Sequence, residues 1–474
     1  MTETIAGLAP PLVRALFAES PRPRRVREHR LAPWLVVAAV SVGAFMGQLD
    51  ASIVSLALPH IERTFAVGPG AVVWVSLAYL LVLVCGLPAV GRLADRLGRK
   101  RLYVQGFVVF TAGSVACGLA PDFPALIAAR CVQGLGAALL QANSVALIRE
   151  TLDRERLGRG LGIQGAAQAV GLAGGPAIGG LLLALGGWRL LFLVNVPAGV
   201  LGVAAGILLL PRSRTFAGPA RLDRAGAAAL TLAAGTLMAA ISLAREPGVT
   251  PGLLATLGGA GLAAGLALPR IERRAVAPLL DLRLLARRGV AAALGSGLVA
   301  QTALFGTLVV VPFDLAAHGI GSATAGLELA ALPLALGVAA PFAGRRAGGR
   351  WARAIAGGGL ALTGVGLIAL GFAHDGPERL AALALAGAGL GAFVPLNNTA
   401  IMRGAPEGRA GAMSGVLNMT RGIGTGLGVA LATLLYATGA GAGPGGADRG
   451  LALALWVLGG LAVLAGAGHA RGPD

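Results

Sequence analysis

The sequence has little charge and no motif for enzyme or metal chemistry. Only 13% of its 474 residues are charged, whereas soluble proteins carry about 25%. It contains no Walker A phosphate loop, no H-E-x-x-H zinc motif and no cluster of cysteine with histidine. A membrane-embedded enzyme would also show a polar catalytic cluster at one face, and the sequence shows none. We therefore expect a protein that is not an enzyme and has no catalytic residue, metal or cofactor.

Cysteine and aromatic residues are also scarce. The three cysteines, Cys85, Cys117 and Cys131, all lie inside apolar runs, which favours small apolar core residues over disulfides. Aromatic residues make up 4% of the chain. A polyaromatic pocket for large planar cations therefore has little support.

Apolar and small residues are abundant instead. Hydrophobic residues make up 56% of the chain, and 76 residues are glycine. Small residues suit membrane helices, where close helix contact replaces the hydrophobic effect. Because no water satisfies backbone groups in a bilayer core, every spanning segment must be helical. The composition predicts an all-α membrane protein whose surroundings are the lipid bilayer.

Fourteen apolar runs are long enough to cross a bilayer core, which takes about 20 residues. Two of them, 225–244 and 250–269, form a central pair whose removal would leave every other orientation unchanged. Each has twenty residues without a charge, so we count both as spans. The predicted spans are residues 32–57, 70–90, 102–120, 123–147, 160–183, 189–210, 225–244, 250–269, 289–312, 323–343, 352–373, 380–401, 410–437 and 450–468.

The positive charges give the expected orientation. With the N-terminus inside, five of the 39 Lys and Arg residues face outside, two lie within spans, and the other 32 lie on the cytoplasmic side. Both termini are then cytoplasmic, in a multi-pass protein of the plasma membrane. Because this charge is spread over eight cytoplasmic segments, we expect no nucleic-acid partner. The expected parts are a basic cytoplasmic tail (1–31), a six-helix bundle (32–212), the extra pair with linkers (213–280), and a second six-helix bundle with a short tail (281–474).

A basic turn lies between the second and third predicted spans. Gly91–Arg101 reads G-R-L-A-D-R-L-G-R-K-R and carries five cations, so we expect a tight cytoplasmic hairpin. It resembles the loop between helices two and three of the major facilitator superfamily, whose fold is two six-helix bundles. Gly344–Arg350 keeps the cations and glycines of this loop but has no aspartate. The resemblance implies gating by Gly91, Asp95, Arg96, Gly98 and Arg99.

The first predicted span carries a more specific pattern. Residues 49–59 read L-D-A-S-I-V-S-L-A-L-P and resemble the first helix of the fourteen-span drug:proton antiporters, with Ser52 and Ser55 in place of Thr and Asn. The resemblance implies a monomeric antiporter that uses the proton gradient to export small organic molecules such as drugs or antibiotics. An exporter of one endogenous metabolite, or a non-transporting membrane sensor on the same scaffold, is the alternative.

The fifth predicted span carries a glycine pattern with one proline. Glycines at this spacing line one side of a helix and allow close approach of a neighbour, and the proline removes one backbone hydrogen bond. The pattern resembles the antiporter motif of proton-coupled exporters, which implies a kinked helix between the halves that seals one side. A general packing face is the alternative. The residues are Gly162, Gly171, Gly175, Pro176, Gly179 and Gly180.

Two charges of opposite sign fall inside spans at matching depth. At about 1.5 Å per residue, Asp50 lies about 24 Å above Trp34 of the first span, and Arg130 about 9 Å below Pro124 of the fourth. In a core about 30 Å thick these depths agree to within a turn. The family resemblance places these helices side by side, so we expect Asp50 to carry the coupling proton and Arg130 to set its affinity. A permanent structural ion pair is the alternative.

Other polar residues inside spans are candidates for a cavity wall or for hydrogen bonds between helices. Arg421 could line the cavity, bind an anionic group or balance Glu328. Of the remaining acids in spans, Asp314 and Glu328 lie near outer ends, and we expect both to face loops or solvent. The cavity candidates are Gln133, Gln141, Asn143, Gln164, Gln168, Glu328, Asn397, Asn398 and Arg421.

Overall fold

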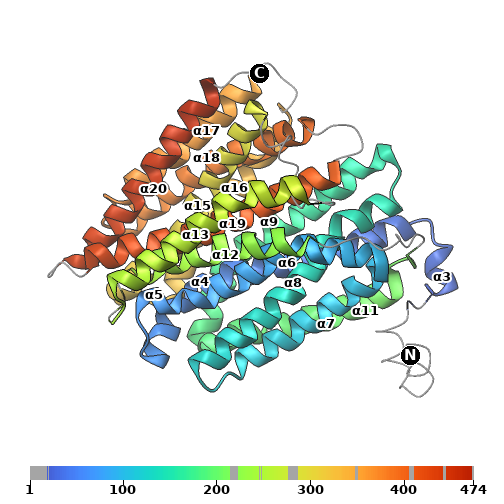
Figure 1. The fold of residues 1–474 in the computed structure, drawn as a ribbon, viewed down its shortest axis with the longest axis horizontal. Coiled ribbons are helices and arrows are strands. Elements are labelled where there is room, and N and C mark those ends of the chain that lie inside the picture. Colours follow the sequence, from blue (N-terminus) through green and yellow to red (C-terminus); the bar gives the residue numbers. More distant parts are fainter. Residues whose placement is uncertain are drawn as a thin grey trace.

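The structure of the protein is a computed structural model that describes residues 19, 21–213, 223–244, 246, 248–275, 287–346, 351–404, 410–440 and 445–471. Within these residues all regular structure is helical, as predicted. The helices gather into two groups that follow the order of the chain (Figure 1).

The first group contains the helices up to α11. Its long helices pack α4 against α9 and α8, and α7 against both α8 and α11. Its helices are α3 (Arg24–Arg27), α4 (Ala32–Phe65), α5 (Pro69–Val72), α6 (Trp74–Leu97), α7 (Arg99–Gly118), α8 (Phe123–Thr151), α9 (Arg154–Gly186), α10 (Trp188–Leu193) and α11 (Asn195–Leu209).

The second group contains the helices from α15 onward. Here α16 packs against α18, α17 against α18 and α20, and α15 against α19. Contacts between the groups join α9 with α16, α6 with α19 and α4 with α15. Its helices are α15 (Arg288–Ala317), α16 (Ser322–Gly344), α17 (Ala352–Leu370), α18 (Gly376–Arg403), α19 (Ala410–Ala440) and α20 (Gly446–Arg471).

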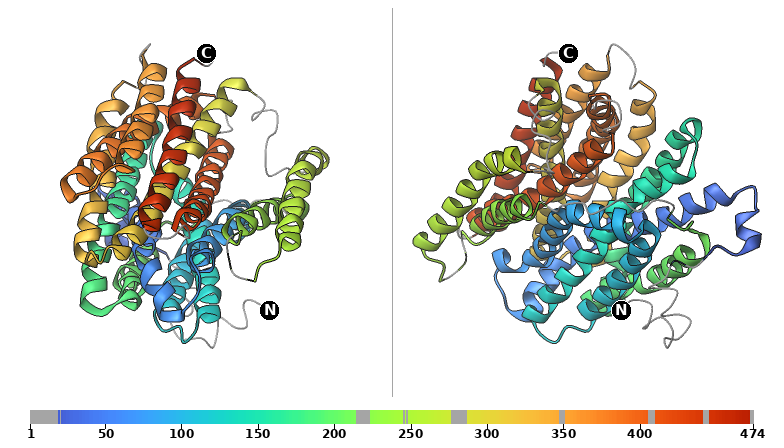
Figure 2. Two further views of the ribbon diagram at one scale, coloured as in Figure 1. Left: turned by 90° about the vertical axis from the view of Figure 1, so that its left-hand side faces the viewer. Right: turned by 45° about the vertical axis from the view of Figure 1, so that its right-hand side comes forward.

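The extra pair consists of α12 (Arg224–Ser242) and α13 (Pro251–Arg274). Helix α12 contacts α6 and α19 and therefore touches both groups, whereas α13 packs mainly on α12. Figure 2 shows the pair projecting from one side of the molecule. Two polar contacts hold it there: the Trp74 indole donates to Ser242 Oγ at 3.2 Å, and the Glu246 carboxylate accepts from the Gly70 backbone N–H at 2.6 Å.

Thirteen helices of the described residues are long and apolar enough to cross a membrane. Helix α7 is not one of them, because it opens with Arg99-Lys100-Arg101 and is interrupted by further polar residues. It nevertheless lies between α8 and α11, which both qualify. The helices also extend past several predicted span ends, as where α4 continues through Pro59 to Phe65. Hydropathy marks where a helix meets lipid, not where its backbone hydrogen bonds stop.

The predicted hairpin over Gly91–Arg101 is shorter in the structure than expected. Helix α6 continues to Leu97 and α7 begins at Arg99, so Gly98 alone breaks the helix. Its φ of 99° is a backbone conformation that glycine adopts far more readily than other residues. Leucine, alanine and arginine are strong helix formers, so the flanking helices persist almost to this glycine.

Candidate functional site

A buried ion pair joins the first and fourth long helices. Arg130 Nη1 on α8 donates to Asp50 Oδ2 on α4 at 2.8 Å, and the side chains are 1% and 0% exposed. The structure thus brings together the two charges that helical rise placed at matching depth. The Arg130 guanidinium carbon lies 4.3 Å from the centre of the Tyr79 ring, so α6 contributes a cation–π contact.

Neutral side chains complete the shell around this pair. Gln133 Nε2 donates to Asp50 Oδ1 at 2.8 Å and to Ser114 Oγ at 2.7 Å. Asn195 Nδ2 on α11 donates to the same Asp50 oxygen at 3.1 Å. Asp50 therefore accepts three hydrogen bonds, all from donors that suit its ionised form. Gln133 belongs to this network and not to the cavity wall for which it was a candidate.

Two members of the shell were not among the predicted site residues. Asn195 and Ser114 are both fully buried. Asn195 could have been noticed as an isolated amide in the apolar run 189–210, since a buried amide needs partners. Ser114 carries no such signal, because a lone serine in a helix usually bonds to its own backbone.

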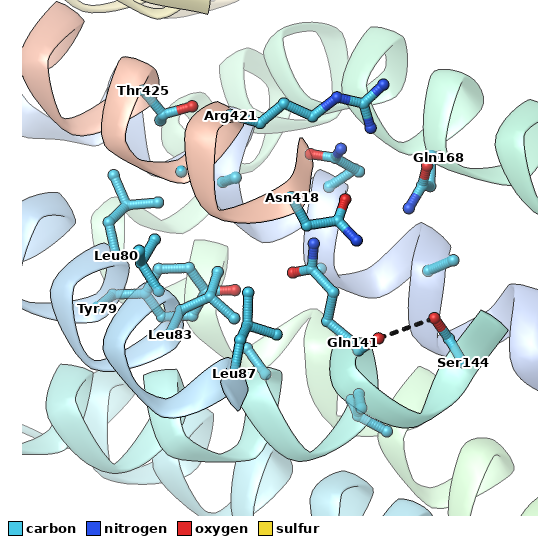
Figure 3. A pocket seen from close by; sticks show the side chains of 18 of the residues that line it. Tyr79, Leu80, Leu83, Leu87, Gln141, Ser144, Gln168, Asn418, Arg421 and Thr425 are labelled. Atoms are coloured by element: carbon cyan, nitrogen blue, oxygen red, sulfur yellow. Dashed lines mark hydrogen bonds between the residues drawn. The ribbon is translucent and has the colours of Figure 1, made fainter. Parts of the chain in front are cut away.

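A central cavity lies beside the ion pair, between the two groups of helices. It consists of three adjoining spaces of about 100, 880 and 310 Å³, which share Gln168 and Arg421 in their walls. Figure 3 shows Gln141, Gln168, Asn418 and Arg421 around the first of these spaces, with leucines of α6 along one side. The cavity thus has a polar part and an apolar part.

The cavity includes most but not all of the predicted lining residues. Asn143 does not reach it, because its amide donates to the Leu139 carbonyl of its own helix at 2.7 Å. Gln48, Gln301 and Asn418 line it without having been predicted to. Hydropathy marks such residues as polar positions in a span but does not say which way they point. The predicted residues that line it are Gln141, Gln164, Gln168, Asn397, Asn398 and Arg421.

Glu328 is the clearest correction among the cavity candidates. Its carboxylate pairs with the Arg379 guanidinium at 2.8 and 3.2 Å and lines none of the three spaces. Glu328 and Asp314 were expected to face loops or solvent, and the structure excludes solvent, since they are 7% and 5% exposed. Arg379 offsets the burial of Glu328, a pairing between α16 and α18 that one span's hydropathy cannot reveal.

Asp314 lies in a second cluster, at the end of α15. His318 Nε2 lies 3.1 Å from Asp448 Oδ1, and His318 Nδ1 lies 3.6 Å from Asp314 Oδ2. One ligand atom from each of these residues lies within 4.8 Å of the others, close enough to hold a metal ion. The cluster joins α15 to the start of α20.

The predicted antiporter motif lies on α9, between α4 and α16. A Cβ on Gly179 would lie 2.8 Å from Ile53 Cγ1, and one on Gly175 would overlap Ser52 Oγ, so this face packs on α4. Gly180 faces α16 instead, where a Cβ on Gly326 would lie 3.0 Å from the Gly180 Cα. Gly171 also packs on α4, against Phe45, and Pro176 presents its carbonyl to Gly326.

In the described part of the chain, the closely packed glycines of this motif lie at one end of the cavity. Gly180 and Gly326 bring α9 and α16 together where α9 ends and α16 begins. At the other end, the largest space is lined by Leu152, Leu157 and Met402, where α8 ends and α9 begins. Gly162 lines this wide end and has no neighbour within 4 Å of a Cβ. The motif thus combines packing glycines with one glycine that faces open space.

The predicted gating loop is described only in part. Arg99 Nε lies 3.2 Å from Glu150 Oε1, which links the start of α7 to the end of α8. Arg96 is exposed, and Gly91 has open space around it. The Asp95 side chain lies outside the described residues. That Asp95 takes part in gating therefore remains a prediction.

Comparison with known proteins gives the family. A sequence model of the Major Facilitator Superfamily matches residues 40–429 and 293–470. The chain belongs to the major facilitator superfamily.

Several known proteins resemble the chain over most of its length. The multidrug resistance protein Stp of Mycobacterium tuberculosis is 34% identical over 399 residues, 82% of this chain and 73% of that protein. The drug efflux pump JefA of the same organism is 33% identical over 406 residues, 82% of this chain and 78% of its own. The tetracenomycin C resistance and export protein of Streptomyces glaucescens is 33% identical over 318 residues, 66% of this chain and 58% of that protein.

A solved structure shares the fold. A bacterial homologue of the human lysosomal transporter Spinster, in an inward-facing and unoccupied conformation, matches 93% of this chain and 97% of its own. The TM-score is 0.67 at 17% identity. With 93% of the chain covered, the match extends over both groups of helices described above.

Proposed function

We propose that this major facilitator protein is a proton-coupled antiporter that exports small organic molecules across the plasma membrane. The observation that carries the proposal is the position of the Asp50–Arg130 pair directly behind the wall of the central cavity. Ala51 and Tyr79 line the cavity, whereas Asp50, next to Ala51, and Arg130, beneath the Tyr79 ring, are buried behind them. A titratable acid inside a membrane bundle is a functional candidate by default.

The contacts of Arg130 suggest how substrate and proton are coupled. Its Nε donates to the Val75 carbonyl of α6 at 2.7 Å, and the same helix supplies Leu80, Leu83 and Leu87 to the cavity wall. A movement of α6 around a substrate would therefore move the guanidinium relative to Asp50. Separation of the two side chains would leave a buried carboxylate without its partner, and uptake of a proton would remove that unpaired charge.

The expected topology has fourteen spans with both termini in the cytoplasm. It includes α7, whose 20 residues measure about 30 Å at 1.5 Å per residue. Under this topology the wide end of the cavity faces the cytoplasm, and the Gly180–Gly326 contact lies toward the outside. The structure then corresponds to an inward-open state, ready to take up a substrate from the cytoplasm. The proton gradient supplies the energy, so no cofactor is required.

The names of the relatives support export of toxic molecules, and two substrate ranges fit. A multidrug range is supported by the two M. tuberculosis proteins, which are named for drug resistance and efflux. A dedicated exporter is the second candidate, because the Streptomyces relative is named for tetracenomycin C. A sensor on the same scaffold would bind such molecules without moving protons.

Proteoliposomes with an imposed pH gradient provide the test. Candidate compounds, including tetracenomycin C, riboflavin and common antibiotics, are added while a pH-sensitive dye inside reports proton movement. We expect at least one compound to collapse the gradient in liposomes with the protein and not in empty ones. Binding without proton movement for every compound that binds would identify a sensor and contradict the proposal.

A further inference from the structure

The charged side chains that line the central cavity, among the described residues, are all arginines. Arg421 of α19 reaches all three spaces, and Arg149 lies at the wide end. No described carboxylate lines the cavity. Two buried acids inside the helical groups are already engaged, Asp50 by Arg130 and Glu328 by Arg379. The cavity therefore carries positive charge that no described acid balances.

Arg421 itself has no protein partner in the described part of the chain. It forms no ion pair or hydrogen bond with the described residues, and its backbone lies in the middle of α19. A guanidinium inside a membrane protein is costly unless it pairs or faces water, and such residues mark ligand pathways. Its planar fork of N–H donors matches carboxylate and similar anions. The missing partner is most simply supplied by a ligand.

The remaining polar lining has groups for further hydrogen bonds. Gln141 and Asn418 point toward one another across the cavity in Figure 3, and Gln168 lies on the far side from the leucines. The amide groups of these three residues can donate hydrogen bonds to a ligand and accept them from it.

The opposite wall is apolar. Leu80, Leu83 and Leu87 follow one side of α6 and face the polar residues across the cavity (Figure 3). The largest space, about 880 Å³, falls within the range of ligand sites, roughly 300–1,000 Å³. The cavity thus suits a molecule with an apolar body and a charged or acceptor-rich end.

We infer that the substrate is an amphipathic organic anion whose carboxylate, phenolate or sulfonate binds the Arg421 guanidinium and whose apolar body packs on the leucines of α6. This inference rests on the proposed export function and names its substrate class. Lipophilic cations are disfavoured, because like charges repel in a site of low dielectric constant. Arg421 is a specificity-determining residue in this assignment.

The charge of the substrate also changes the energetics of export. If one proton enters for each monovalent anion that leaves, two positive charges move inward per cycle. An inside-negative membrane potential then drives the exchange, because each cycle moves net positive charge inward. Exchange of one proton for a monovalent cation would move no net charge. The response to membrane potential therefore distinguishes the two substrate classes independently of any mutation.

A matched pair of probes tests the inference by binding. 2-Naphthoate and 2-naphthylmethylammonium share an apolar body and differ in the sign of their charge. Equilibrium dialysis uses the full chain in nanodiscs, and empty nanodiscs correct for partition into lipid. We expect the anion to bind at least about tenfold more tightly than the cation, as a charge-assisted hydrogen bond implies. Equal binding, or tighter binding of the cation, would overturn the inference without use of any variant.

Three variants connect the preference to Arg421. Arg421→Gln should weaken binding of 2-naphthoate about tenfold or more and leave the cation unchanged or improved. Arg421→Lys keeps the charge but not the fork and should fall between. Arg403→Gln removes an exposed arginine of α18 that does not line the cavity and should bind like the wild type. Unchanged anion binding in folded Arg421→Gln protein, with its melting curve as the check, would also overturn the inference.

The outcomes also separate this inference from the proposed function. Proton movement driven by cations and not by anions would support antiport and contradict an anionic substrate. Arg421-dependent binding of 2-naphthoate without proton movement for any compound would support the site and contradict antiport.

Discussion

At the scale of single residues, Asp50 is surrounded by donors that favour its charge. Arg130, Gln133 and Asn195 each donate to its carboxylate, and all four side chains are buried. The same shell would suit a permanent structural ion pair and a proton site in its deprotonated state. The two roles differ in what happens when the charge is removed.

Asp50→Asn should abolish export driven by a pH gradient while leaving some downhill exchange. It should also destabilise the protein, because a buried Arg130 without its partner costs about 3–5 kcal/mol. The double variant Asp50→Asn with Arg130→Gln removes both charges and should recover much of that stability without regaining pH-driven export. Transport at fixed pH gradients and thermal melting measure the two effects.

Normal pH-driven accumulation by the Asp50→Asn protein would place the coupling acid elsewhere. Recovery of coupling in the double variant would show that the pair is structural. Arg130→Lys supplies an intermediate case, since it keeps the charge but loses the planar fork. It should shift the pH optimum or lower the rate.

His318 gives a pH-dependent contribution to stability outside the membrane-spanning segments. Its hydrogen bond to the Asp314 backbone carbonyl, at 2.9 Å, raises the pKa of its ring, and the Asp314 and Asp448 charges act in the same direction. Partial burial and the Arg379 charge oppose this rise in pKa. A raised pKa in the folded state means that the protonated ring stabilises the fold.

The sign of the pH effect follows from this rise in pKa. The stabilisation is fully present below the unfolded pKa, about 6.5, and disappears as the pH rises through the folded value. His318→Gln should therefore lower the melting temperature at pH 5.5 and leave it unchanged at pH 8.5. The decrease should be on the order of 1 °C, because the His318–Asp448 pair is exposed. Asp448→Asn should reproduce the difference. A decrease of equal size at both pH values would exclude the protonated ring as its source.

At the scale of single elements, the two ends of α9 lie in different surroundings. Its last turns pack closely against α4 and α16 through Gly179 and Gly180. Its first turns line the wide end of the cavity, where Gly162 faces open space. A larger side chain should therefore have opposite consequences at the two ends.

Gly180→Val should separate α9 from α16, because the new side chain would overlap the Ser322 carbonyl and approach Gly326. Overpacking of this kind costs about 1–3 kcal/mol, so the closed end should open more often. We expect slower export and faster passive proton leak in proteoliposomes. Gly162→Val is the matched control, with the same change of helix propensity and free space around it. Equal leak in the two variants would show that the glycines serve no sealing role.

At the scale of the whole molecule, the number of spans determines where the C-terminus lies. Thirteen helices of the described residues qualify by length and composition, and α7 would be the fourteenth. An even number returns the chain to the starting side, whereas an odd number leaves the C-terminus outside. The extra pair α12–α13 does not affect this parity, because it adds two spans together.

Reporter fusions should place both termini in the cytoplasm. A fluorescent protein at either end should fluoresce, and alkaline phosphatase inserted after Gly186 should be active outside. Deletion of residues 223–275 with a short linker should leave the C-terminal reporter on the same side, since two spans are removed. An active phosphatase at the C-terminus would instead indicate an odd number of spans, with α7 not crossing.

Composition and helical rise, both read from the sequence, determined the class, most spans and the depth of the central ion pair. Little charge and many small residues indicate a membrane protein, whose spans are helical because no water satisfies backbone groups in the bilayer core. A rise of about 1.5 Å per residue then gives the depth of each residue along its span. Asp50 and Arg130 could therefore be matched before any contact was known. The break at Gly98 was also within reach, since glycine between strong helix formers favours a turn there.

Tertiary structure alone decided which way each polar side chain points. Gln141 faces the cavity, Gln133 faces Asp50, and Asn143 bonds to its own helix, although all three are amides on α8. Helices in lipid are apolar on every side. Their sequence therefore predicts how deep a residue lies in the membrane, but it says little about how the helix is rotated about its axis. Packing between helices sets that rotation. It pairs Glu328 with Arg379, so Arg421 faces the cavity without a described acid as its partner.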